Sequence, residues 1–130
     1  MTGMIAYVPQ RGDLVWLSLD PTLGNEQAKR RPVLVISPGD YNSRGLKLAI
    51  VCPITNRAKH HMFDVSLPPN LPEVSGVIQA DQIRSVDWQI RMANKITSVS
   101  EEVVLQVVGL QLALLDPDGA FSGSSPDADE

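Results

Sequence analysis

The segment from Asn25 to Pro32 (Asn-Glu-Gln-Ala-Lys-Arg-Arg-Pro) joins one carboxylate to three basic side chains. An arginine guanidinium is planar and can donate two parallel hydrogen bonds to a phosphate. Pro32 holds the residue before it away from helical conformations, which would fix the direction in which Arg31 projects. A preorganised arginine of this kind suits phosphoryl chemistry, although many ordinary surface loops share the composition.

Other residue types that carry chemistry are sparse or badly spaced. His60 and His61 are adjacent, so on a strand they would point to opposite faces and could not bind one metal ion together. The single cysteine, Cys52, excludes a disulfide within the chain and a multi-cysteine zinc site, and its apolar neighbours indicate a core residue. The sequence contains no glycine-rich phosphate loop and no Gly-x-Ser-x-Gly elbow. We therefore expect no metal and no cofactor.

The formal net charge of −4 hides an uneven distribution along the chain. Residues 116–130 hold five acids and no base, so residues 1–115 carry 11 bases and 10 acids. Within residues 29–59, seven bases stand against one acid, Asp40. Such a stretch could form a basic surface that attracts phosphates, or an ordinary solvated face. The seven bases are Lys29, Arg30, Arg31, Arg44, Lys47, Arg57 and Lys59.

Short strands separated by turn signals make up most of the chain. Val15, Leu17 and Leu19 fall on one face at period two, which predicts a strand over 13–20. The next segment, 21–30, lacks a sustained pattern and is predicted to be a loop. Further strands are predicted at 32–38, 46–53, 63–67, 76–84 and 92–99. Many short strands between Gly/Pro turns indicate a small, mainly antiparallel barrel.

One helix is predicted near the end of the chain, over 102–115, with Ser98 or Ser100 as its cap. The rest of this helix is mostly apolar apart from one polar stripe, so we expect a sheet and another chain to cover it. The stripe consists of Glu102, Gln106 and Gly109.

The last segment, 116–130, is rich in Gly, Ser, Pro and Asp and is expected to be a disordered acidic tail. Residues 1–115 are expected to fold as a single domain. No apolar run approaches the roughly 20 residues that a membrane-spanning helix needs. The N-terminus also lacks the basic and apolar regions of a secretory signal. We therefore expect a cytoplasmic protein with no membrane partner.

Three blocks of the chain carry a longer pattern. Residues 12–38 (GDLVWLSLDPTLGNEQAKRRPVLVISP) contain Gly-Asp, Trp, Asp-Pro-Thr-x-Gly-x-Glu-Gln, Arg-Pro and Ser-Pro in that order. Residues 51–55 (VCPIT) contain a Val-x-Pro-x-Thr strand, and residues 76–85 (GVIQADQIRS) contain an Ala-Asp-Gln block. In order and spacing these blocks resemble the MazF/PemK (Kid) family of toxin endoribonucleases, from about residue 7 to residue 115.

The resemblance implies an SH3-like barrel of the kind shared with the gyrase poison CcdB, assembled as a homodimer. It implies ribosome-independent, sequence-specific and metal-independent cleavage of single-stranded RNA, chiefly messenger RNA, which would inhibit translation and growth. It also implies a cognate MazE-like antitoxin whose acidic, flexible segment lies across the active grooves, with a heterohexamer as one form of the complex.

By position in the motifs, the resemblance assigns catalytic roles to Arg31, Thr55, Glu26 and Asp81, the last drawn from the Kid-like branch. Cleavage of this kind uses the ribose 2′-hydroxyl as nucleophile and leaves a 2′,3′-cyclic phosphate and a 5′-hydroxyl. Arg31 would stabilise charge on the phosphate, Glu26 would act as base, and Thr55 would hydrogen-bond a phosphate oxygen. Salt-dependent contacts with the RNA backbone are expected from Lys29, Arg30, Arg57, Lys59 and Arg84.

Each assignment except that of Arg31 has a structural alternative. Glu26 could form an ion pair within its loop, Asp81 could be a turn residue, and Thr55 could be an ordinary strand residue. Trp16 and Trp88 could stack on bases, or they could belong to the core or an interface. Two other functions stay open: a non-enzymatic, CcdB-like toxin that binds gyrase, and an inert barrel that binds RNA without cutting it.

Overall fold

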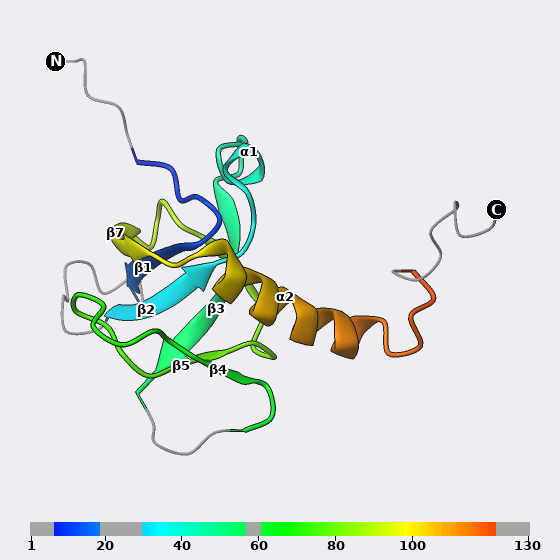
Figure 1. Cartoon of the computed structure of the whole chain (residues 1–130). Coiled ribbons are helices and arrows are strands. Elements are labelled where there is room, and N and C mark those ends of the chain that lie inside the picture. The colour runs from blue at the N-terminus through cyan, green and yellow to red at the C-terminus, as the bar shows by residue number, and fades with distance from the viewer. Residues whose placement is uncertain (1–6, 19–29, 57–60, 122–130) are drawn as a thin grey trace, which may run out of the picture.

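Antiparallel pairing joins the strands of the structure into one curved sheet, with a helix packed against one face (Figure 1). The computed structural model describes residues 7–18, 30–56 and 61–121. These residues form, in order, β1 (Asp13–Ser18), β2 (Arg30–Val35), α1 (Gly39–Asn42), β3 (Leu48–Thr55), β4 (Asp64–Ser66), β5 (Val77–Gln79), β6 (Arg84–Asp87), β7 (Asn94–Ser98) and α2 (Glu101–Leu115). The prediction of a mainly β fold with a C-terminal helix is confirmed.

The long strand β3 holds the sheet together because it changes partners along its length. Residues 48–51 pair with β6, residues 51–53 pair with β2, and residues 54–55 pair with β5. The sheet order is β4-β5-β3-β2-β1-β7, with β6 attached to β3. A bulge between Leu14 and Val15 shifts the pairing of β1 with β7. Shared partners and a bulge both bend a sheet toward a barrel.

Alternating side chains of the central strands form two apolar cores, one on each face of the sheet. The core beneath α2 includes Leu14, Leu34, Cys52, Val103 and Val107. The core on the other face includes Val15, Leu17, Val33, Val51 and Trp88. The predicted alternation of β1 is therefore confirmed for Val15 and Leu17, while Leu19 lies outside the described residues.

Helix α2 begins one residue before its predicted start. Ser100 is the N-cap, and its Oγ accepts a hydrogen bond from the backbone N–H of Val103 at 3.4 Å. The polar stripe is exposed as expected, and the buried face contains Val103, Val104, Val107 and one amide, Gln111. The last turns extend beyond the sheet (Figure 1). Four leucines of α2 stay substantially exposed in the single chain: Leu105, Leu112, Leu114 and Leu115.

Two segments differ from the sequence-based predictions. The single strand expected at 76–84 is wrong, because a turn interrupts it: the N–H of Gln82 donates to the carbonyl of Gln79 at 3.0 Å, which separates β5 from β6. Residues 39–42 form the short helix α1, which was not predicted. Beyond α2, the Asp116 carboxylate accepts from the N–H groups of Ala120 and Phe121, which closes a turn. The domain boundary at residue 115 stays a prediction.

Candidate active site

Arg31 lies near the start of β2, at the point where the strand emerges from the core. It is opposite Leu17 of β1, and its side chain is exposed. Pro32 follows it within the same strand, so Arg31 has the extended backbone that the sequence predicted. Two hollows, each of about 310 Å³, open beside Arg31, and Arg31 lines both.

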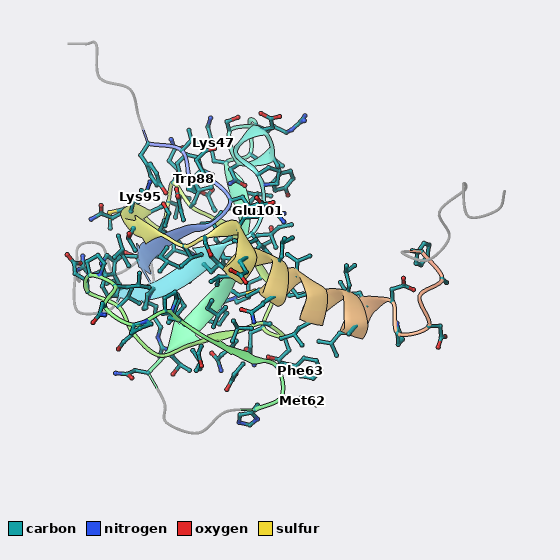
Figure 2. The ribbon with its side chains drawn as sticks, viewed as in Figure 1. Lys47, Met62, Phe63, Trp88, Lys95 and Glu101 are labelled. Atoms are coloured by element: carbon teal, nitrogen blue, oxygen red, sulfur yellow. The ribbon has the colours of Figure 1, made fainter. Side chains whose placement is uncertain are left out.

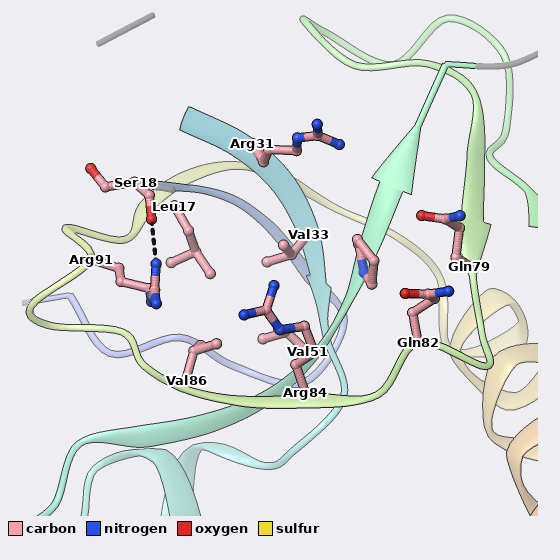
Figure 3. A pocket seen from close by; sticks show the side chains of 11 residues that line it. Leu17, Ser18, Arg31, Val33, Val51, Gln79, Gln82, Arg84, Val86 and Arg91 are labelled. Atoms are coloured by element: carbon pink, nitrogen blue, oxygen red, sulfur yellow. Dashed lines mark hydrogen bonds between the residues drawn. The ribbon is translucent and has the colours of Figure 1, made fainter. Parts of the chain in front are cut away.

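The first hollow, here named the arginine pocket, gathers three guanidinium groups (Figure 3). Arg31 comes from β2, Arg84 from β6, and Arg91 from the turn after β6. The two side-chain amides of Gln79 and Gln82 line its other end (Figure 3). Its floor is apolar and consists of Leu17, Val33, Val51, Pro53 and Val86, with Ser18 at one edge. No acidic side chain occurs among the described residues that line it, so its field favours an anion.

No sequence pattern pointed to Arg91, and a long-range contact explains its place in the arginine pocket. Its Nη1 donates to the carbonyl of Ser18 at 2.9 Å, and the N–H of Ser18 donates to the carbonyl of Arg91 at 2.8 Å. This reciprocal pair ties the turn after β6 to the end of β1. Because the partners are 73 positions apart, no local pattern could reveal the contact. Gln79 and Gln82 were missed for a similar reason, since they meet at the unpredicted turn.

A buried amide supports that turn from beneath. Gln111 of α2 donates through Nε2 to the carbonyl of Ala80 at 3.0 Å, and the same nitrogen lies 3.0 Å from Cys52 Sγ. Burial is the main cause that raises the pKa of Cys52 to about 12; the hydrogen bond from Gln111 lowers it and the charge of Asp81 raises it. Cys52 is therefore a protonated core residue, as its apolar neighbours indicated.

The second hollow, here named the tryptophan pocket, lies at the ends of β1, β2 and β3. It is lined by Trp16, Arg30, Arg31, Pro32, Ile54, Thr55, Asn56, Glu73, Val74 and Ser75. Val33 of β2 is paired with Pro53 of β3, and the same antiparallel register extended by two residues sets Arg31 across from Thr55. The fold thus brings the two best-matched motif residues to one edge.

The two tryptophans have different environments. Trp88 is buried, and its Nε1 donates to the carbonyl of Asn42 at 2.8 Å, so it is a core residue. Trp16 is half-buried in the tryptophan pocket, where its Nε1 donates to Oε1 of Glu73 at 3.2 Å. The Arg30 guanidinium lies over the Trp16 ring at 4.5 Å from its centroid, a cation–π contact.

Sequence comparisons agree with this geometry. A family model described as a PemK-like, MazF-like toxin of type II toxin–antitoxin systems matches residues 10–113. The chain belongs to this family. It is 41% identical over 110 residues to the endoribonuclease toxin MazF of Escherichia coli K12, covering 84% of this chain and 95% of that protein. It is 37% identical over 103 residues to the Escherichia coli endoribonuclease PemK, covering 77% of each chain.

Solved structures of the family have the same fold. A MazF structure from Deinococcus radiodurans superimposes with a TM-score of 0.73 at 45% identity, covering 85% of this chain and 98% of that one. A MazE–MazF complex from the same organism contains a chain with a TM-score of 0.75 and 41% identity over the same shares. The predicted family and barrel-like fold are therefore confirmed.

The site residues predicted from the sequence fall into three groups in the structure. Arg30, Arg31, Thr55 and Arg84 line the two pockets. Asp81 does not line either pocket; it is exposed in the turn between β5 and β6. The remaining predicted residues, Glu26, Lys29, Arg57 and Lys59, lie outside the described residues.

The basic stretch 29–59 does not form one surface where it is described. Arg44 and Lys47 line a separate apolar hollow of about 250 Å³ beside α1, with Tyr41 and Leu46. Figure 2 shows Lys47 beside α1 and Trp88. The bases that join Arg31 come instead from later in the chain, at Arg84 and Arg91.

His61, the described member of the histidine pair, lines neither pocket. His61 is exposed, and its N–H donates to the Asp64 carboxylate at 2.9 Å, whereas His60 lies outside the described residues. Among the described residues, no group of three or more His, Cys, Asp or Glu side chains could hold a metal ion. None of the helices in the described ranges has the length and apolar character to cross a membrane.

Proposed function

We propose that this chain is the toxin of a type II toxin–antitoxin pair and acts as an endoribonuclease on single-stranded RNA, chiefly messenger RNA. The observation that carries the proposal is Arg31, which stands where the anion-attracting arginine pocket meets the pocket that contains Thr55. The similar Escherichia coli protein is named an endoribonuclease toxin. Cleavage of messenger RNA would inhibit translation and growth, and it would place the action of the protein in the cytoplasm.

The reaction is an attack of the ribose 2′-oxygen on the adjacent phosphorus. A base takes the 2′-hydroxyl proton, the bond from phosphorus to the 5′-oxygen breaks, and that oxygen takes a proton. The products are a 2′,3′-cyclic phosphate and a 5′-hydroxyl. The Arg31 guanidinium stabilises the charge that develops on the phosphorane, and the Thr55 hydroxyl donates to a non-bridging oxygen. These groups would act without a metal ion, because the guanidinium supplies the positive charge.

The base that takes the 2′-hydroxyl proton must be a group other than arginine. An arginine side chain keeps its proton at any pH at which the protein works and is therefore a poor base, so Glu26 is our candidate for the base at the 2′-oxygen. Asp81 is a secondary candidate, next to Gln82 in the exposed turn. Arg84, Arg30, Lys29, Arg57 and Lys59 would bind neighbouring phosphates, and the structure adds Arg91 to this group.

Two surfaces of the chain indicate which partners it would bind. The exposed leucines of α2 form an apolar face that a second copy would cover, which supports a homodimer. The arginine pocket would attract the acidic segment of a MazE-like antitoxin as readily as it attracts RNA. MazE–MazF complexes are known for the similar Deinococcus radiodurans protein. A heterohexamer with the antitoxin is one form such an assembly would take. A gyrase-binding toxin is not favoured, because binding alone needs no Arg31–Thr55 pair.

The test is incubation of the protein, free of antitoxin, with a long mixed-sequence RNA in excess EDTA, followed by mapping of the fragment ends. We expect discrete cuts with 5′-hydroxyl ends, lost in Arg31→Ala and kept in Arg44→Ala, whose guanidinium lines the separate hollow beside α1. RNA that is bound but left intact would indicate the inert RNA-binding barrel instead. If the protein neither binds nor cuts the RNA, the result would favour the alternative hypothesis of a gyrase-binding toxin.

A further inference from the structure

Glu73 lies in the tryptophan pocket with an unusual backbone. Its φ of 63° is in the left-handed region, which is unfavourable for a residue with a side chain. Such strain persists only where the surroundings hold the residue in place. Gly76 provides that hold, because a Cβ at this position would collide with the Thr55 carbonyl oxygen. The segment that carries Glu73 is thus pressed against the end of β3, beside the proposed catalytic threonine.

The Glu73 carboxylate is fixed from the other side by Trp16. The indole Nε1 donates to Oε1 at 3.2 Å across 57 positions of sequence, and Arg30 covers the indole ring. Trp16 is the hydrogen-bond partner that the described residues provide for this carboxylate, which leaves Oε2 and a second lone pair of Oε1 to accept further bonds. The strand β1, the strand β2 and the 73–75 segment therefore hold one acceptor group at a defined place.

A carboxylate beside a phosphate-binding arginine would weaken the binding of RNA unless it contacts something other than phosphate. The tryptophan pocket shares Arg31 with the arginine pocket, so its occupant lies next to the phosphate that Arg31 binds. In single-stranded RNA the group next to a phosphate is a nucleoside. Its base can stack on an arginine plane such as that of Arg30 and offer its Watson–Crick edge to a side chain.

We propose that the tryptophan pocket receives a guanine next to the cleaved phosphate, and that Glu73 is the residue that selects it; this rests on the nuclease function proposed above. Guanine offers two parallel donors, N1–H and N2–H, which match the two oxygens of a carboxylate. Cytosine and adenine each place one amino donor beside a ring acceptor that repels a carboxylate. Uracil offers one N–H between two repelling carbonyls. Guanine is therefore the base that Glu73 prefers.

Two protein variants and a matched control separate base selection from cleavage. Glu73→Gln replaces one acceptor oxygen by a donor amide of the same size, and Glu73→Asp keeps the charge but shortens the side chain. Glu102→Gln removes an exposed carboxylate on α2, away from both pockets. Each protein is incubated with a pool of random-sequence RNA, and the fragment ends are sequenced. Thermal unfolding of each protein reports whether it is folded.

We expect the unchanged chain and Glu102→Gln to cut mostly at sites with guanine on one side of the cleaved bond. In Glu73→Gln the preference for guanine should fall by about 10- to 100-fold, the size of one good bidentate base contact, while sites with other bases are still cut. The guanine preference of Glu73→Asp should lie between those of the unchanged chain and Glu73→Gln. With RNA that carries a 2′-deoxy sugar at the cut, replacement of the guanine by inosine, which lacks the N2 amino group, should weaken binding to the unchanged chain and leave Glu73→Gln unaffected.

Two results would overturn the inference and are distinguishable. If the unchanged chain cuts RNA without regard to guanine, or if folded Glu73→Gln keeps the guanine preference, Glu73 does not select the base although the nuclease function stands. If no protein in the series cuts RNA, the proposed nuclease function fails, and the base selection that depends on it fails too.

Discussion

The arginine pocket and the tryptophan pocket have the same volume and share Arg31, but they differ in what lines the rest of each wall. The arginine pocket adds two further guanidiniums and two amides over an apolar floor, with no acid among its described residues. The tryptophan pocket adds an indole, a threonine, an asparagine and a carboxylate. Phosphate contacts position a nucleic acid, and base contacts specify its sequence. The difference suggests a division of labour in which one pocket binds charge and the other reads a base.

The largest expected effect is that of Arg31, because it serves both pockets. Arg31→Ala should lower the cleavage rate by about 10³-fold or more, the loss typical of an arginine that stabilises a phosphoryl-transfer transition state. Since Arg31 is exposed on the rim, the free energy of unfolding should change little. Single-turnover cleavage of a fixed RNA and urea unfolding measure the two quantities.

Arg31→Lys provides the matched control, because it keeps the charge and loses the planar fork. We expect partial activity from it, well below that of the unchanged chain. Cleavage by Arg31→Ala at a near-normal rate would contradict the assignment of Arg31 and would remove the link between the pockets.

The next largest effect is expected from a change to Gln111, which lies beneath the arginine pocket and contacts that pocket's turn. Gln111→Leu removes the amide donor that holds the Ala80 carbonyl and leaves that oxygen buried with only the weak hydrogen bond from the Cys52 thiol, at 3.9 Å. The free energy of unfolding should fall by about 1–3 kcal/mol. The turn that carries Gln79 and Gln82 should also loosen, so that the KM for RNA rises while the base preference stays the same. If Gln111→Leu changed the base preference and left the KM unchanged, the two pockets would not have the separate roles proposed for them.

The sequence predicted well where local patterns carry the information. Pro32, directly after Arg31, predicted an extended backbone for Arg31, and the apolar surroundings of Cys52 predicted a core thiol. The family motif brought Arg31 and Thr55 together before the register of β2 and β3 was known. For Arg31 and Cys52 a few neighbouring residues fix the conformation, so those two predictions need no knowledge of distant contacts.

The sequence failed where the structure depends on contacts between distant segments. The turn at Ala80 and Asp81 contains neither Gly nor Pro, so nothing in the pattern separated β5 from β6. Gln111 occurs in an apolar helix, and only its contact with Ala80 shows why an amide is buried there. Glu73 and Trp16 are likewise brought together by the curvature of the sheet. Among the residues that distinguish the two pockets, sequence reasoning therefore missed Gln79, Gln82, Arg91 and Glu73, although it named Arg84, Trp16 and Thr55.

A smaller effect should separate Arg84 from Arg91 within the arginine pocket. Either change to Gln should weaken RNA binding several-fold and should reduce the slope of log affinity against log salt by about 0.7, the value for one phosphate contact with a single strand. Arg91→Gln should also lower the free energy of unfolding, because Arg91 Nη1 binds the Ser18 carbonyl, whereas Arg84 is exposed on β6. Fluorescence binding at several salt concentrations measures the slopes. Neither change should alter the base preference; an altered preference would contradict the division between the pockets.

The smallest expected effect uses the two tryptophans, each of which donates one indole hydrogen bond. Trp16→Phe removes the bond to Glu73 and should reduce the guanine preference by about two- to fivefold, as the loss of one anchoring bond predicts, with little change in stability. Trp88→Phe removes the buried bond to the Asn42 carbonyl and should lower the free energy of unfolding by about 1–3 kcal/mol without changing the preference. Random-RNA cleavage and urea unfolding of both variants form a crossed test. If Trp16→Phe leaves the preference intact while Glu73→Gln abolishes it, the backbone of the 73–76 segment, rather than the indole, holds the carboxylate in place.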